Sequence, residues 1–80
     1  MVDIEILETM IEVEERMTER KRDEIVYRIN SLVDKVAEKK FAVNTLQYEV
    51  DALAQAIREL ARMESKVEGM KEVLKCINEE

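Results

Sequence analysis

The sequence predicts an all-α fold, a helical hairpin with a long coiled-coil helix that assembles with a second copy into a dimeric helical bundle. The 80 residues include no proline and one glycine, so signals for turns are scarce. Charged residues make up 40% of the chain, and no long segment alternates apolar with polar residues as a strand does. Between residues 25 and 60, apolar residues recur in steps of three and four, which is the seven-residue repeat of a coiled coil.

The first predicted helix covers about residues 3–20, and Asp3 is a suitable N-cap. Its apolar rows cover nearly half of the circumference, so we expect it to contact two neighbouring helices. An acidic row lies on the opposite face and comprises Glu8, Glu12, Glu15 and Glu19.

A helix boundary is predicted near residues 20–23, because the segment 18–24 interrupts every apolar row. The three basic residues at 20–22 suit the last turn of one helix, and Asp23 and Glu24 suit the first turn of the next. The alternative is a single helix that continues through this segment, since neither glycine nor proline marks a turn.

The long predicted helix covers about residues 23–78 and contains the seven-residue repeat. One row of the repeat is β-branched and the other is mostly leucine, which favours a parallel pair, whereas alanine-rich flanks favour an antiparallel bundle. The orientation therefore stays open at this point. The predicted oligomer interface comprises Ile25, Ile29, Leu32, Val36, Val43, Leu46, Val50, Leu53, Ile57, Leu60, Val67, Met70 and Leu74.

Two irregularities are expected in the long helix, near residues 39–44 and 60–69. Lys39 falls where the repeat requires an apolar residue, and we favour a continuous helix over a second break followed by a new helix with Asn44 near its start. After Leu60 the apolar rows shift by three residues, and Gly69 lies within the shifted set.

Three aromatic residues, Tyr27, Phe41 and Tyr48, fall on the back of the repeat. A phenylalanine there is unfavourable in water, so we expect these side chains to contact the first helix or a partner.

No cofactor, metal site or catalytic group is expected. The chain has no histidine, and Cys76 is its one cysteine, without a histidine to activate it. Glu12 and Glu15 have the spacing of half a Mg²⁺ site, but no matching acidic pair occurs in the long helix. The sequence therefore predicts a protein that is not an enzyme.

The leading functional hypothesis is a cytoplasmic structural or adaptor module that joins proteins, its own copies first, through helix packing. Another helical protein is a further candidate partner. The net charge of −6 argues against nucleic acid as a partner, and no apolar run is long enough to cross a membrane. The alternative is a small acidic regulator that occupies a basic, nucleic-acid-binding site on another macromolecule.

Overall fold

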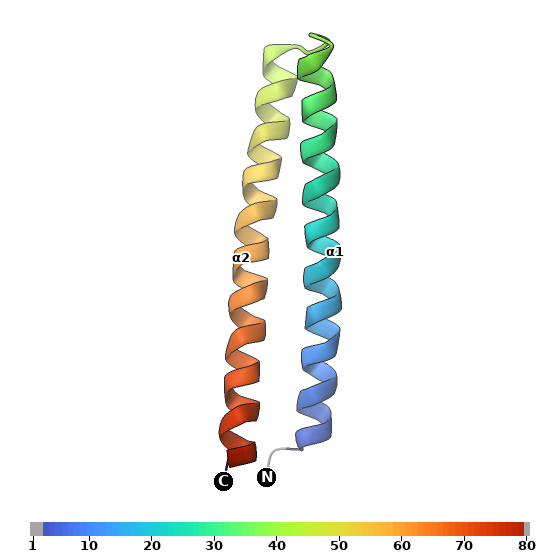
Figure 1. Cartoon of the computed structure of the whole chain (residues 1–80). Coiled ribbons are helices and arrows are strands. Elements are labelled where there is room, and N and C mark those ends of the chain that lie inside the picture. The colour runs from blue at the N-terminus through green and yellow to red at the C-terminus, as the bar shows by residue number, and fades with distance from the viewer. Residues whose placement is uncertain (1–2, 80) are drawn as a thin grey trace.

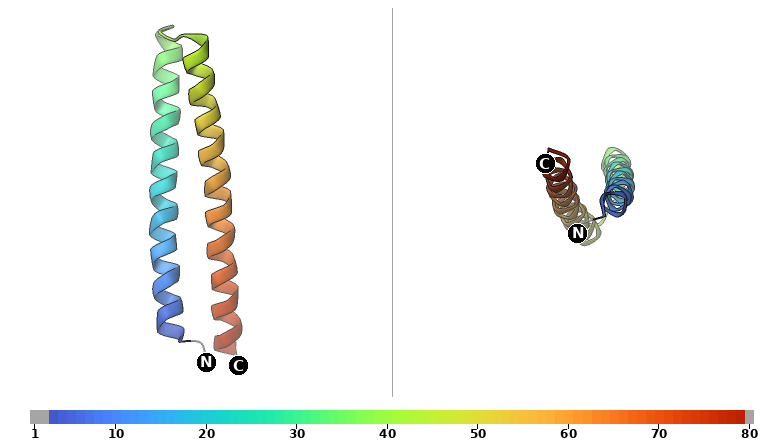
Figure 2. Two further views of the ribbon diagram at one scale, coloured as in Figure 1. Left: turned by 180° about the vertical axis from the view of Figure 1, so that it is seen from behind. Right: turned by 90° about the horizontal axis from the view of Figure 1, so that it is seen from below.

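Two long helices pack side by side in opposite directions and form a hairpin (Figure 1). A computed structural model describes residues 3–79, with α1 at Ile4–Ala37 and α2 at Val43–Glu79. The rod measures 58 × 15 × 15 Å, and Ile4 and Glu79 lie at the end opposite the turn (Figure 2). The predicted all-α hairpin is confirmed, and residues 3–79 contain no strand.

The first helix begins at the cap that the sequence predicts. Asp3 has an extended backbone, and its carboxylate accepts hydrogen bonds from the amides of Glu5 at 2.9 Å and Ile6 at 3.4 Å. These bonds satisfy two of the amide groups that the first turn of a helix leaves without partners.

The predicted boundary near residues 20–23 is wrong, because α1 continues through this segment to Ala37. The charged side chains there pair along and between the helices. Lys21 binds Glu24 one turn away and Glu59 on α2, and Arg22 binds Glu19. The run of charges is therefore a pattern of helical ion pairs and does not mark two helix ends.

The chain reverses at residues 38–42, where we expected only an irregularity in a continuous helix. Lys39 has a φ of 58°, in the left-handed region. The amide of Lys39 donates to the carbonyl of Val36, and that of Lys40 to the carbonyl of Lys35, at 3.1 and 3.0 Å. This is the Schellman arrangement that ends helices, with lysine at the position that glycine usually occupies.

The second helix is continuous from Val43 to Glu79, so the irregularity expected near residues 60–69 does not occur. The amide of Leu46 bonds the carbonyl of Ala42 at 2.9 Å and closes the first turn. Gly69 lies within the helix, and a Cβ added to it would have no atom within 4 Å. One glycine costs a helix about 1 kcal/mol, too little to end a helix that packs along its length.

The core is one narrow seam between the two helices. Ile11, Thr18 and Ile25 are buried on α1 and recur every seven residues, and Ala56 and Val67 are buried on α2. The covered row of α2 keeps one phase through its whole length, without the shift that we expected after Leu60. It comprises Leu46, Glu49, Leu53, Ala56, Leu60, Met63, Val67, Met70, Leu74 and Ile77.

Candidate functional site

The predicted interface residues separate into two groups in the hairpin. The first group is buried or half-buried in the seam, and the second, the β-branched row of the repeat, is exposed. The seam group comprises Ile25, Leu32, Leu46, Leu53, Leu60, Val67, Met70 and Leu74. The exposed group comprises Ile29, Val36, Val43, Val50 and Ile57.

We use the name loop-end face for this exposed row together with its neighbour Val33. Its side chains have exposed fractions between 41% for Ile29 and 72% for Val43. The two helices contribute to the same side of the hairpin, because Val33, Val36 and Val50 line one apolar groove with Leu32 and Leu46 at its floor. The face thus extends across both helices in the half of the rod near the turn. Its members are Ile29, Val33 and Val36 of α1 with Val43, Val50 and Ile57 of α2.

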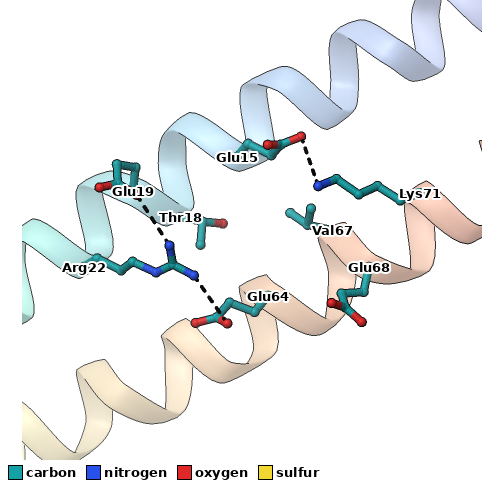
Figure 3. A pocket seen from close by; sticks show the side chains of 8 residues that line it. All are labelled: Glu15, Thr18, Glu19, Arg22, Glu64, Val67, Glu68 and Lys71. Atoms are coloured by element: carbon teal, nitrogen blue, oxygen red, sulfur yellow. Dashed lines mark ion pairs between the residues drawn. The ribbon is translucent and has the colours of Figure 1, made fainter.

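The same side becomes charged in the other half of the rod. Arg22 stands seven residues before Ile29, and Glu64 stands seven residues after Ile57. Each therefore lies on the same side of its helix as the loop-end face. These two residues border a depression that we name the charged hollow (Figure 3). The hollow is lined by Glu15, Thr18, Glu19, Arg22, Glu64, Val67, Glu68 and Lys71.

Ion pairs cross the charged hollow, but they leave it with a surplus of negative charge. Arg22 lies 3.5 Å from both Glu19 and Glu64, and Lys71 lies 3.6 Å from Glu15 (Figure 3). Glu68 has no ion-pair partner among the described residues. Four carboxylates therefore share two cations, and a basic group from elsewhere would find a favourable potential here.

A second apolar surface lies on the opposite flank of the seam, near the open end of the hairpin. For the row Ile11, Thr18 and Ile25, the positions one residue before and four residues after each member project to opposite flanks of the coiled coil. Met10 and Met17 precede Ile11 and Thr18 in this way, whereas Arg22 follows Thr18 by four. This open-end face comprises Ile6, Met10, Val13 and Met17, with exposed fractions between 41% and 59%.

We expected the aromatic side chains to contact the first helix or a partner. In the hairpin, the chain's own first helix does not cover them. Tyr27 belongs to α1 itself and Tyr48 to α2, and both are 75% exposed. Phe41 lies in the turn and is 42% exposed. The helices meet along one seam, and these residues stand away from it, so contact with a partner stays a prediction.

Charged side chains occupy part of the seam and couple the two helices. Nζ of Lys21 lies 2.9 Å from a carboxylate oxygen of Glu59 and 3.0 Å from one of Glu24. The hydrogen bonds that the Lys21 ammonium donates, first to Glu59 and then to Glu24, raise the pKa of Lys21. The hydrogen bond from Lys21 lowers the pKa of each carboxyl group.

Two further pairs cross the seam, Lys66 with Glu14 at 3.0 Å and Lys35 with Glu49. Sequence reasoning missed these contacts, because it placed a helix boundary near residue 21 and had no antiparallel register from which to pair the charges.

No cluster of three or more histidine, cysteine, aspartate or glutamate side chains among residues 3–79 could hold a metal ion. The acidic row of α1 instead provides Glu15 and Glu19 for ion pairs with Lys71 and Arg22. Cys76 is exposed.

A scan against family models, a search of curated proteins and a search of solved structures each found no match to this chain. Neither described helix has a stretch of sufficient length and apolarity to span a bilayer. The surfaces of the hairpin are therefore the basis for a functional assignment.

Proposed function

We propose that this protein is a non-catalytic interaction module, a hairpin that binds a second copy through its loop-end face and joins proteins by helix packing. One observation carries the proposal. Six branched aliphatic side chains, each more than two fifths exposed, share one side of the hairpin by their positions in the repeat, and three of them line one groove. Contiguous apolar surface of this kind is typical of protein–protein contacts.

The small core of the hairpin supports the same conclusion. Only Ile11, Ile25, Ala56 and Val67 are buried apolar residues among those described. A single seam between two helices removes little apolar surface from water, and each Å² removed stabilises a protein by roughly 25 cal/mol. Packing two hairpins face to face would add a second layer and produce a four-helix bundle, a common way for helical hairpins to complete a core.

The alternative function, a small acidic regulator that occupies a basic site, receives less support. Such a protein needs rows of free carboxylates, but Glu14, Glu15 and Glu59 pair with lysines of the opposite helix. These three carboxylates are therefore engaged between the helices and are not free to bind a basic site. We place the module in the cytoplasm, where its one exposed cysteine would stay reduced.

The proposal is tested by the mass of the protein in solution. We expect light scattering after size exclusion to give twice the chain mass of 9.4 kDa at micromolar concentration. The double variant Val36→Glu, Val50→Glu places charges in the loop-end face and should give a helical species of one chain mass, because burying unpaired carboxylates is unfavourable.

Val73→Glu is the matched control, since Val73 is 51% exposed on the other flank of α2. This variant should keep the mass of two chains. A folded wild-type protein of one chain mass would contradict the proposal, and so would a double variant that stays dimeric.

A further inference from the structure

We propose that the second copy lies in the opposite direction, with the two turns at opposite ends, and that Lys39 and Lys40 of each turn reach the charged hollow of the other copy. This inference rests on the proposed self-association and adds its geometry. It follows from the division of one side of the hairpin into an apolar half and a charged half.

Full overlap of two hairpins is unfavourable in either direction. If both turns point the same way, the two charged hollows face each other, and each has four carboxylates and two cations. If the turns point in opposite ways with full overlap, each apolar half covers a charged half and removes Arg22 and Glu64 from water. Both arrangements desolvate charges without new partners, which is costly.

Half overlap in opposite directions brings only the loop-end faces together. The row from Val43 to Ile57 spans 14 residues, or about 21 Å at ~1.5 Å per residue. A two-fold axis through the middle of this row, near Val50, superposes one apolar half on the other. The turn of each copy then lies just beyond Ile57 of its partner, where Arg22 and Glu64 begin the charged hollow.

The charges of the turn complement those of the hollow. No carboxylate among the described residues lies within ion-pair distance of Lys39, and Lys40, with a side chain 79% exposed, is 3.9 Å from Glu38. The hollow has a surplus of negative charge, because Glu68 is a carboxylate that has no ion-pair partner among residues 3–79. Two such contacts form per dimer, because a two-fold axis repeats each one.

Cys76 reports the direction of the second copy without any substitution, since it is exposed near the open end of the hairpin. It lies 26 residues beyond Val50, or about 39 Å along the helix, so the two labels would be about 80 Å apart in opposite-direction dimers. In same-direction dimers they would be separated only by helix widths and label lengths, about 20–40 Å.

The experiment measures the distance between nitroxide labels on Cys76 in the deuterated dimer by electron–electron double resonance. A second sample carries the label at Asp51→Cys in a Cys76→Ser background, where both directions give about 20–40 Å. A long distance at 76 with a short one at 51 supports the inference. Short distances at both positions overturn the inference and leave the dimer intact. A monomeric protein overturns the proposed function as well.

Charge reversal tests the lysine contact separately. Lys39→Glu with Lys40→Glu should weaken dimerisation about tenfold, as expected for a few exposed ion pairs. Adding Glu64→Lys and Glu68→Lys to the same chain should restore most of the affinity. The control reverses Arg58 and Arg62, which lie away from the loop-end face, and should change the affinity less than threefold. Unchanged dimerisation of the turn variant, or failure of the restoring pair, would overturn the contact.

Discussion

At the residue scale, Lys39 has the least usual conformation among the described residues. Its φ of 58° is one that glycine adopts without a steric penalty, while a residue with a Cβ pays about 1 kcal/mol or more. Replacing Lys39 by glycine should therefore raise the free energy of unfolding by about 0.5–1 kcal/mol relative to Lys40→Gly. Both variants lose one lysine from the turn, so urea denaturation at one protein concentration isolates the backbone effect. Equal stabilities would contradict the left-handed turn.

Lys21 is the main cause of the lowered pKa values of two carboxyl groups, those of Glu24 and Glu59. Their pKa values lie below the ordinary 4.5 because the Lys21 ammonium donates to each carboxylate. Their stabilisation is thus complete above about pH 4.5 and is lost as the pH falls through the folded-state pKa. The raised pKa of Lys21 acts at the other extreme, since its stabilisation holds below 10.5 and is lost at higher pH.

The Lys21→Met variant should return both carboxyl pKa values towards 4.5, as measured by an NMR pH titration of the side-chain carboxyl carbons. Lys75→Met, a change in an exposed residue near the end of α2, is the control and should leave both values unchanged. Equal titration curves in wild type and Lys21→Met would show that Lys21 does not bind these groups in solution.

At the scale of elements, the periodicity predicted the helices, but it did not predict where the chain turns. A glycine usually marks the Schellman turn, and here Lys39 takes that position, so the only signal was a polar residue in the repeat, which we interpreted as an irregularity in a continuous helix. The charged segment at residues 18–24 had the opposite effect and resembled a helix boundary, although Lys21 is one of the charged seam residues of α1. The charged residues at every second seam position of α1 are Glu14, Lys21, Arg28 and Lys35.

The repeat also contains two adjacent rows that sequence reasoning combined into one interface. Ile25 is 8% exposed and belongs to the seam within one chain, whereas Ile29 is 41% exposed and belongs to the loop-end face. Ile25→Ala should lower the free energy of unfolding by about 2–4 kcal/mol at any protein concentration, because it leaves a cavity between α1 and α2.

Ile29→Ala should instead lower the stability of the isolated hairpin by less than about 1 kcal/mol and weaken dimerisation, because its side chain is already partly hydrated. Denaturation at two protein concentrations and sedimentation equilibrium separate the two effects. Equal losses of hairpin stability in the two variants would contradict the assignment of the rows.

At the scale of the whole molecule, which apolar residues are free for a partner depends on how the chain folds back on itself. Any seven-residue repeat predicts that helices meet, but the sequence does not say whether they come from one chain or two. Once α2 covers Ile25 and Leu32, the remaining β-branched row becomes the candidate contact between chains. The open-end face corresponds to the second apolar row of the first predicted helix, which the sequence already indicated as wider than one seam, and α2 leaves it exposed.

The thermal stability of the whole molecule should therefore depend on protein concentration. Unfolding of a dimer produces two free chains, so each tenfold increase in concentration stabilises the dimer by about 1.4 kcal/mol. For two chains of 80 residues this raises Tm by about 3–5 °C per tenfold step. Circular dichroism melts over a hundredfold range should show this increase for wild type and for Val73→Glu. The double variant Val36→Glu, Val50→Glu should melt at one temperature throughout, and a wild-type Tm that does not change with concentration would show that the hairpin is stable as a single chain.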